Sequence, residues 1–376
     1  MVVNSVTRKI KVVNYLGAKI GSGGIESFVT SVAEKINDYD IDFVLCVNYR
    51  NDSIYQQRLT DNEVEVVYLG NKKSYLYNLK KLYIYLKRNR NVILHLHAST
   101  GGMYLHAFLA KICGVNDILY HIHSIKSPKY TIKSVKDSIL KEIFRKIPKV
   151  QIACSEEAGK KFYGRKGSYV IAHNGIDINR FVFSAELRKE YRNELKMNQE
   201  FLIIQIGRLS YPKNQMFSLK VLNECRRKGL SFKALIIGGG SDLQQLDDYI
   251  VQKGLQEYIQ VLPPQEKIEA YYMAADLMLF PSVFEGLGIV AIESQVAGLP
   301  IICSEYIPQD VFLTDYIKKA SIEHCEDWVR MIEDFMGMTI NRKELSAIGQ
   351  KNCEKRGYSI ENTCCELVDI YRKIHN

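Results

Sequence analysis

Two glutamates, Glu285 and Glu293, lie eight residues apart in a stretch whose pattern could position them for chemistry. Glu285 follows an apolar run of strand length at 275–280, and Glu293 lies within 287–297, where apolar residues recur at the spacing of one helix face. Gly298 ends that helix, and another apolar run follows it. The stretch therefore predicts a strand, a loop carrying Glu285, a helix carrying Glu293, and a second strand.

The loop after a strand is where ligands bind in an open parallel sheet, because loops and helix N-termini converge beyond the strand ends. There Glu285 can accept hydrogen bonds from hydroxyl groups, and Gly286 and Gly288 allow the backbone to approach a ligand closely. The N–H groups of the first helical turn can bind an anion. Glu293, about two turns further along, would contact another part of the same ligand. A sugar nucleotide, with hydroxyls at both ends and anionic charge between them, fits this pattern.

The segment EGLGIVAIE (285–293) resembles the Glu-x7-Glu signature of retaining glycosyltransferases of family 4, which have the GT-B fold. In that family the first glutamate contacts hydroxyls of the donor sugar, and the second binds the ribose of the nucleotide. The resemblance implies a catalytic role for Glu285. It also implies a donor-binding role for Gly286, Leu287, Gly288, Ile289 and Glu293. The alternative is that both glutamates are solvated carboxylates of a helix.

A glycine-rich turn near the start of the chain is a second candidate for phosphate binding. Gly23 and Gly24 directly precede a predicted helix, and Glu26 lies in its first turn. Backbone N–H groups in such a turn can cradle a pyrophosphate. The segment GGIE resembles the opening of family 4 enzymes, where this loop flanks the donor phosphates and the acceptor. We therefore expect Gly23 and Gly24 at the donor and Glu26 at the acceptor, the alternative being a connection with no ligand.

Two basic residues, Arg208 and Lys213, follow the predicted strand 201–206. Arginine can form two parallel hydrogen bonds to phosphate oxygens, while lysine supplies a compact charge. The pattern resembles the "GRL…K" segment of sugar-nucleotide transferases, whose arginine and lysine neutralise the donor diphosphate. We expect the same donor-binding role here, although basic loop residues are usually only solvated.

Four histidines end two of the predicted strands, as His95 and His97 in one and His121 and His123 in the next. The alternation of a strand places each pair on one face. A His-x-His pair could bind zinc, but no cysteine or acidic cluster accompanies these residues, so we expect no metal. The family resemblance implies a histidine that reaches the donor sugar and phosphate. We expect this catalytic residue to be His121, with His123 as the next candidate, and His97 to bind the acceptor; buried histidines are the alternative.

The length and the composition of the chain predict a two-domain protein of the soluble globular type. A chain of 376 residues, 47% hydrophobic and 25% charged, is long enough for two cores. No apolar run approaches the ~18 residues of a membrane span, and no signal-like apolar core opens the chain. Nine cysteines without a C-x-x-C pair are typical of reduced thiols. We therefore expect a cytoplasmic location.

A formal charge of +9 indicates an anionic partner. Two basic segments dominate: Lys72–Arg90, which is interleaved with tyrosines, and Lys126–Lys149, which contains a basic amphipathic helix. Such segments can lie on an anionic membrane, so we expect peripheral contact at the inner membrane face. An ordinary helix packed on the sheet is the alternative. No recognised nucleic-acid-binding module is present, and we expect no nucleic-acid partner.

Strands and helices alternate along the whole chain, which predicts an α/β protein with two doubly wound, Rossmann-like domains. The resemblance implies the GT-B arrangement, in which the domains face each other across a cleft and the last helix crosses back to the first domain. We expect an acceptor-binding domain at 1–178, a linker at 179–198, a donor-binding domain at 199–355 and the returning helix at 356–376.

The resemblance implies retaining transfer of a hexose or related sugar from a nucleoside-diphosphate sugar, with UDP favoured, to a hydroxyl. The expected acceptor is a glycan or lipid-linked intermediate of capsule or exopolysaccharide synthesis. We expect no cofactor or metal, because Arg208, Lys213 and helix N-termini could stabilise the departing diphosphate. The alternatives are a nucleotide-sugar 2-epimerase of the same fold, and transfer to a protein or a soluble acceptor.

Overall fold

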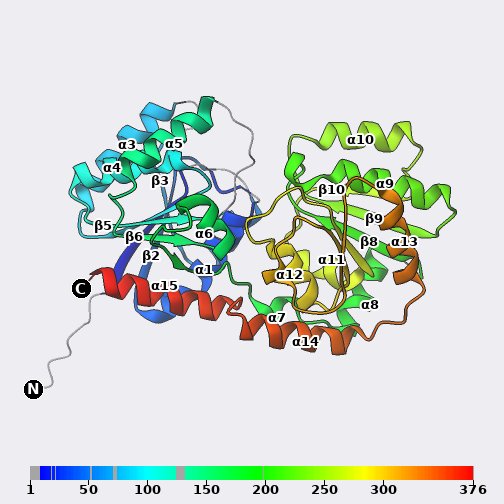
Figure 1. The fold of residues 1–376 in the computed structure, drawn as a ribbon. Coiled ribbons are helices and arrows are strands. Elements are labelled where there is room, and N and C mark those ends of the chain that lie inside the picture. Colours follow the sequence, from blue (N-terminus) through cyan, green and yellow to red (C-terminus); the bar gives the residue numbers. More distant parts are fainter. Residues whose placement is uncertain are drawn as a thin grey trace, which may run out of the picture. The chain divides into compact units, whose positions relative to one another are not determined.

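The computed structural model describes residues 9–17, 19–21, 23–50, 53–70, 74–123, 132–197 and 199–375, without the side chains of 132–134. It divides into two compact units. Unit 1 comprises Met1–Asn174 and Ile360–Asn376, and unit 2 comprises Gly175–Ser359. Each unit is a parallel β-sheet covered by helices on both faces (Figure 1).

Unit 1 contains a seven-stranded parallel sheet with the order β3-β2-β1-β4-β5-β6-β7. Its strands are β1 (Ile10–Tyr15), β2 (Ile41–Val47), β3 (Glu65–Tyr68), β4 (Ile93–Ala98), β5 (Asp117–Ile122), β6 (Val150–Ala153) and β7 (Val170–Ile171). Its helices are α1 (Gly24–Ile36), α2 (Ile54–Asp61), α3 (Tyr75–Arg88), α4 (Tyr104–Cys113), α5 (Ile132–Phe144), α6 (Glu156–Tyr163) and α15 (Ile360–His375), with short 3-10 turns at Asn37–Tyr39 and Gly101–Met103.

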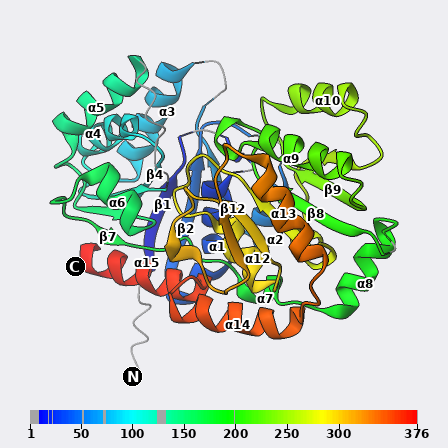
Figure 2. The same ribbon diagram turned by 45° about the vertical axis from the view of Figure 1, so that its right-hand side comes forward.

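The two faces of the unit 1 sheet carry different side chains. Leu94 and Leu96 of β4 face an apolar core shared with α3 and α4, and α3, α4 and α5 gather on this side in both views (Figure 1, Figure 2). His95 and His97 alternate with these leucines and project to the opposite face. There α1 and α15 pack on the sheet through a second apolar core that includes Phe28. The predicted pairing of histidines on one strand face is confirmed, since the His95 and His97 rings lie 4.1 Å apart.

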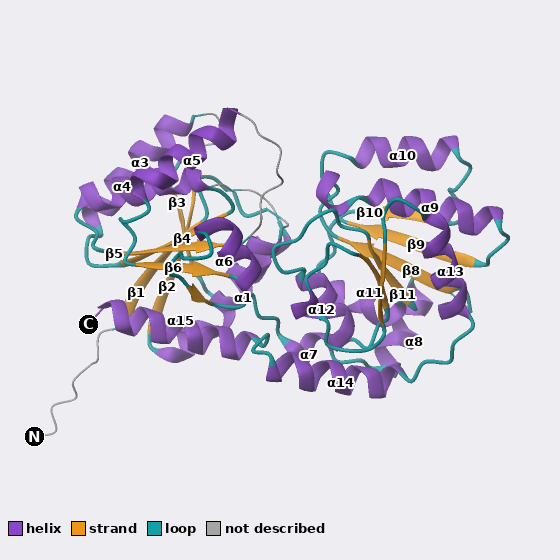
Figure 3. Cartoon of the chain, viewed as in Figure 1, coloured by secondary structure: helices purple, strands orange, loops and turns teal. Residues whose placement is uncertain are grey.

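Unit 2 contains a six-stranded parallel sheet with the order β10-β9-β8-β11-β12-β13. Figure 3 labels β8, β9, β10 and β11 of this sheet. Its strands are β8 (Phe201–Ile206), β9 (Phe232–Ile237), β10 (Ile259–Leu262), β11 (Leu277–Phe280), β12 (Ile301–Ser304) and β13 (Ile317–Ala320). Its helices are α7 (Ile178–Phe181), α8 (Ala185–Glu194), α9 (Gln215–Arg227), α10 (Leu243–Gln252), α11 (Ile268–Ala274), α12 (Ile289–Val296), α13 (Cys325–Met336) and α14 (Arg342–Lys355), with 3-10 turns at Tyr211–Lys213 and Gln309–Val311.

Both faces of this second sheet are buried, as its nearly continuous apolar strands require. Helices α9, α10 and α13 cover one face, where Trp328 is fully buried. Helices α11, α12 and α14 cover the other, where Tyr272 and Phe280 belong to the core. The strand, loop, helix and strand predicted over 275–303 are therefore present as β11, the Glu285 loop, α12 and β12.

The segment 179–198, expected as a linker, instead belongs to unit 2 and contains most of α7 and all of α8. Arg188 and Arg192 of α8 both donate to the Asp276 carboxylate, at 2.5 and 3.2 Å. Their guanidinium groups also donate to the Ala274 carbonyl at the end of α11. These charged side chains therefore hold α8 against the rest of unit 2.

The last helix returns to unit 1, as expected from the sequence. Helix α15 packs against α1, and Cys364, Leu367 and Tyr371 lie in the apolar core that contains the inner side chains of α1. Within the described part of the chain, no helix is both long and apolar enough to span a bilayer.

Candidate functional site

The loop between β11 and α12 positions Glu285 at the carboxyl end of the unit 2 sheet. Gly288 caps α12 with φ +88°, in the left-handed region that glycine adopts without strain. An added Cβ there would lie 3.3 Å from Cε1 of Phe280. The glycine therefore allows the chain to turn from the loop into the helix directly over the end of β11.

Lys213 and Glu285 form an ion pair with 2.6 Å between Lys213 Nζ and Glu285 Oε1. Lys213 ends the 3-10 turn after β8, so the pair joins two neighbouring strands of the sheet. The Glu285 side chain is only 10% exposed and that of Lys213 21% exposed. Lys213 Nζ also lies 5.3 Å from the centre of the Phe280 ring. Both charges are thus largely shielded, which strengthens their attraction relative to a surface pair.

Backbone contacts hold the two loops together around this pair. The Val283 N–H donates to the Pro212 carbonyl at 2.9 Å, and Asn214 Nδ2 donates to the Pro281 carbonyl at 3.2 Å. Buried Gln205 of β8 donates to the Lys213 carbonyl at 2.8 Å. The positions of the cation and the carboxylate are therefore fixed by the fold and not by their mutual attraction alone.

The segment that follows β8 at Gly207 lies against the segment that follows β9 at Gly238. An added Cβ at Gly238 would lie 1.9 Å from the Gly207 carbonyl oxygen, so these turns pack backbone against backbone. Arg208 lies in the first turn with an exposed side chain, and its carbonyl accepts from Gln215 Nε2 at 2.9 Å. The arginine expected at the donor diphosphate is therefore accessible at the end of the sheet where Lys213 lies.

Glu293 lies in α12 and is nearly buried. Its Oε2 accepts a hydrogen bond from the Tyr272 hydroxyl of α11 at 2.7 Å. Sequence reasoning missed Tyr272, because it lies 21 residues earlier on another helix and no local pattern connects the two. Leu287 is also buried, whereas Ile289 is partly exposed at the first residue of α12.

The glycine-rich turn of unit 1 ends at α1. Gly23 caps this helix in an extended conformation, and Gly24 is its first residue. An added Cβ at Gly21 would lie 2.7 Å from Glu26 Oε1, so the Glu26 side chain reaches back over the turn. Next to Gly24 an added Cβ would meet nothing within 4 Å, which leaves space beside the helix N-terminus.

The structure places the histidines in the interior of unit 1, where the sequence predicted a ligand-binding rim. His121 is wholly buried in β5, with its ring 5.5 Å from the Phe28 ring, and its contact with a donor stays a prediction. His97 is buried as well and hydrogen-bonds to Asn14, and its role at an acceptor stays a prediction. His123 follows the last residue of β5 and is 6% exposed. The histidines lie on one face of the strands, as the sequence predicted. Helices α1 and α15 cover that face and bury them.

Burial keeps these imidazoles neutral. Desolvation lowers the pKa of His95 and that of His123 to about 3. It also lowers the pKa values of His97 and His121 well below the ordinary value, with further contributions from neighbouring histidines. At neutral pH the cluster therefore carries no net charge from its imidazoles.

The basic segments are described in part, since Lys72, Lys73 and residues 126–131 lie outside the described residues. In the described part, α3 exposes Leu76 and α5 exposes Ile139 and Ile143. Lys80 and Lys81 of α3 and Lys136 of α5 are exposed as well. The predicted basic, amphipathic character of this face is therefore present on α3 and α5.

Two doubly wound parallel sheets define a GT-B protein, and a shielded lysine–glutamate pair at the strand ends of the second sheet suits a ligand with hydroxyl and anionic groups. Residues 188–352 match the family model "Glycosyl transferases group 1". The matched segment lies within unit 2, so the match identifies unit 2 as a domain of the glycosyltransferase type.

Two curated relatives extend over most of the chain. It is 25% identical to "Putative glycosyltransferase EpsF" of Bacillus subtilis, over 77% of this chain and 78% of the relative. It is 24% identical to the "UDP-Gal:alpha-D-GlcNAc-diphosphoundecaprenol alpha-1,3-galactosyltransferase" of Escherichia coli, over 78% of each chain. Among solved structures, Anabaena Alr3699/HepE in complex with UDP and glucose superposes with a TM-score of 0.79 at 18% identity, covering 95% of this chain and 98% of that one.

Proposed function

We propose that this protein is a retaining glycosyltransferase that moves a hexose or related sugar from a UDP-sugar to a hydroxyl of a lipid-linked or polysaccharide intermediate. The observation that carries the proposal is the Lys213–Glu285 pair, with 2.6 Å between Nζ and Oε1 at the strand ends of unit 2. A cation and a carboxylate held side by side suit a ligand in which a diphosphate is joined to a hydroxylated sugar.

In this proposal Lys213 and Arg208 stabilise the negative charge that develops on the departing diphosphate. The N–H groups around Gly286, Gly288 and Ile289 add partial positive charge from the start of α12. Because these groups are fixed before the donor binds, little reorganisation accompanies the reaction. No metal ion is required for this stabilisation.

In this proposal the two glutamates bind the two ends of the donor, Glu285 the hexose and Glu293 the ribose. Glu285 accepts hydrogen bonds from hydroxyls of the hexose, and only Oε1 is engaged by Lys213 in the ion pair. Glu293 offers the ribose a carboxylate that the Tyr272 hydroxyl orients through Oε2. A hydrogen bond between a hydroxyl and a carboxylate is stronger than one between neutral groups, which favours polyol ligands at both positions.

The choice of donor and acceptor is supported by the relatives. The Escherichia coli relative is a galactosyltransferase named for a UDP-Gal donor and an acceptor linked to diphosphoundecaprenol, and the Anabaena structure holds UDP and glucose. The basic, apolar face of unit 1 suits an acceptor embedded in a membrane. A 2-epimerase of the same fold would consume the nucleotide sugar without any acceptor, which distinguishes it from a transferase.

The donor site is tested by Lys213→Ala and Glu285→Ala, each of which we expect to lower transfer by at least about 100-fold, because charge stabilisation or sugar orientation is lost. The measurement is release of UDP and formation of glycosylated acceptor. Lys228→Ala is the matched control, since Lys228 forms a 3.1 Å ion pair with Glu333 on the surface of the same unit. Wild-type turnover in both site variants would reject the assignment.

The nucleotide is tested by a thermal-shift screen of the wild type with UDP, GDP, ADP and their sugars. A ligand that binds only the native state raises the melting temperature, and we expect the largest rise with the UDP compounds. Equal turnover with and without added Mg²⁺ or Mn²⁺ would support a metal-independent transfer, whereas activity only with added metal would contradict it.

A further inference from the structure

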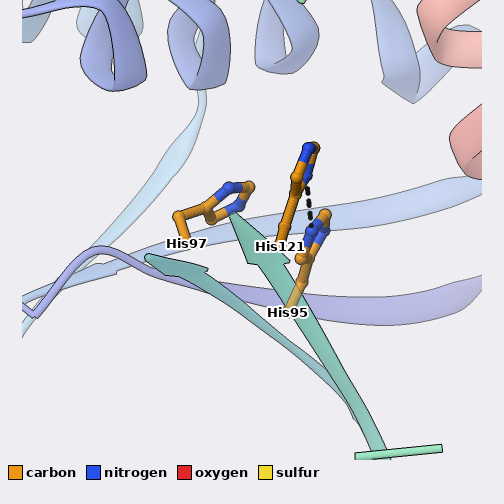
Figure 4. A group of neighbouring side chains, drawn as sticks. All are labelled: His95, His97 and His121. Atoms are coloured by element: carbon orange, nitrogen blue, oxygen red, sulfur yellow. Dashed lines mark hydrogen bonds between the residues drawn. The ribbon is translucent and has the colours of Figure 1, made fainter. Parts of the chain in front are cut away.

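Four histidines lie together under α1 and α15 in the interior of unit 1. His95, His97 and His121 project from β4 and β5 toward one another (Figure 4). Each offers one ring nitrogen, and these three nitrogens lie within 4.8 Å of one another. All three side chains are buried. Neutral, buried imidazoles with converging nitrogens are the ligand set of a transition-metal site.

The outer nitrogens of the cluster have partners that fix the rings. His95 Nδ1 lies 2.7 Å from the Tyr371 hydroxyl of α15. His97 Nε2 lies 3.0 Å from Asn14 Oδ1 of β1. Metal-binding histidines usually make such a hydrogen bond through the nitrogen that does not bind the metal, because it sets the tautomer and orients the ring.

With the side-chain amides of Asn14 and Asn174 in the orientations of the structure, the contact between His97 and His123 lacks one hydrogen. His97 Nε2 faces Asn14 Oδ1 and His123 Nδ1 faces Asn174 Oδ1, both at 3.0 Å. An amide oxygen only accepts, so with the amides in these orientations both ring nitrogens must carry the hydrogen. The other two nitrogens, His97 Nδ1 and His123 Nε2, are 2.9 Å apart and in neutral rings both present lone pairs. A cation next to these nitrogens would remove the repulsion.

We propose that His95, His97 and His121 form a binding site for one Zn²⁺-like divalent ion. Imidazole suits Zn²⁺, Co²⁺, Ni²⁺ and Cu²⁺, whereas Mg²⁺ and Ca²⁺ prefer oxygen ligands, which the three residues lack. His123 Nε2 lies 2.9 Å from His97 Nδ1 and is the candidate for a fourth ligand.

The site would be structural. It joins β4 and β5, and through Tyr371 it adds a connection to α15, the last helix of the chain. An ion that binds the folded cluster and not the unfolded chain stabilises the fold by mass action. This inference does not rest on the proposed transfer reaction, and the ion takes no part in it.

The test uses the untagged full-length chain, freed of metal and then titrated with Co²⁺ as a spectroscopic probe for Zn²⁺. We expect one equivalent to bind, with the visible absorption bands of a four-coordinate nitrogen site, and to be displaced by Zn²⁺. His97→Gln and His121→Gln should each lower the affinity by at least about tenfold. His324→Gln, at an exposed histidine of unit 2, should bind as the wild type does.

A second measurement remains valid if the variants fail to fold. The melting temperature of the metal-free wild type should rise with Zn²⁺ and not with Mg²⁺. The proposal is overturned if the wild type retains no metal and Zn²⁺ does not raise its melting temperature. In that case the missing proton comes from a rotated Asn174 amide, whose nitrogen would donate to His123. Wild-type Co²⁺ affinity in folded His97→Gln and His121→Gln would overturn it equally.

Discussion

The ion pair between Lys213 and Glu285 offsets the free-energy cost of removing both charged groups from water. Neither side chain is more than 21% exposed, so removing one partner leaves the other charge poorly solvated. The single variants should therefore lose stability as well as activity. Their folding must be checked by circular dichroism before turnover is compared. Lys228 and Glu333 are far more exposed, and loss of that pair should cost at most about 1 kcal/mol.

His106 of α4 gives a residue-level prediction on pH. Burial lowers its pKa from 6.5 to about 4. Between these values the unfolded chain binds a proton at this site and the folded chain does not, so stability falls as the pH is lowered from about 6.5 to 4. In His106→Gln, which cannot titrate, the loss of stability between pH 7 and 5 should be smaller by about 2 kcal/mol. Urea unfolding at the two pH values measures this difference.

The contribution of His106 is separable because the other buried histidines remain in both proteins. An equal loss of stability in wild type and His106→Gln would show that this residue is protonated in the folded state or hydrated at low pH. A larger loss in the variant would contradict the sign of the shift.

At the scale of elements, the turns after β8 and β9 are the part of unit 2 most sensitive to added volume. The Leu209 N–H donates to the Gly239 carbonyl at 3.1 Å, and the Asp242 N–H donates to the Leu209 carbonyl at 3.2 Å. An added Cβ at Gly240 would lie 2.0 Å from that Leu209 oxygen. Glycine is therefore required by the close approach of two backbones.

Gly240→Ala should destabilise the protein by about 1–3 kcal/mol, because the turns must separate. It should also weaken UDP binding, since the same turns hold Arg208 and Lys213. Gly239→Ala is the matched control, because the nearest atoms to its Cβ would lie at an ordinary 3.5 Å. Thermal unfolding and UDP titration measure both effects. Equal stability and equal UDP affinity of the two variants would show that the turns can accept a methyl group at Gly240.

At the scale of the whole molecule, the face of α3, α4 and α5 suits an anionic membrane. Leu76 of α3 is 76% exposed, and Ile139 and Ile143 of α5 are exposed among lysines. Apolar side chains and cations on one surface favour the interface of an anionic bilayer, each surface cation contributing about 1 kcal/mol. We expect sedimentation with anionic vesicles at low salt, and weaker binding as salt screens the charges.

The paired change Ile139→Asp and Ile143→Asp should weaken vesicle binding by about tenfold or more, because apolar area is lost and negative charge is added. Val251→Asp is the control, since Val251 is an equally exposed apolar residue on α10 of unit 2. If the wild type does not bind anionic vesicles at low salt, or if the control loses binding as strongly, this face does not contact the membrane.

Much of the architecture was predictable from local patterns. Period-2 and period-3.6 spacing placed β11, α12 and β12, and the glycine at 288 marked the turn between them. The segment 179–198 was expected as a linker, and no local pattern indicates that its arginines bind Asp276, some 80 residues away. The histidines were placed on the correct strand face, but which face the helices cover is not encoded in strand periodicity.

The sequence by itself determined the two sheets and the glutamates at one strand end, because periodicity and glycine positions act over a few residues. Only the tertiary structure decided that Lys213 meets Glu285, 72 positions away, because the order of strands brings β8 beside β11. It also decided that His97 pairs with His121 and that Tyr371, 276 positions from His95, completes the cluster. Such contacts depend on strand order, register and the return of the last helix, which no short stretch of sequence specifies.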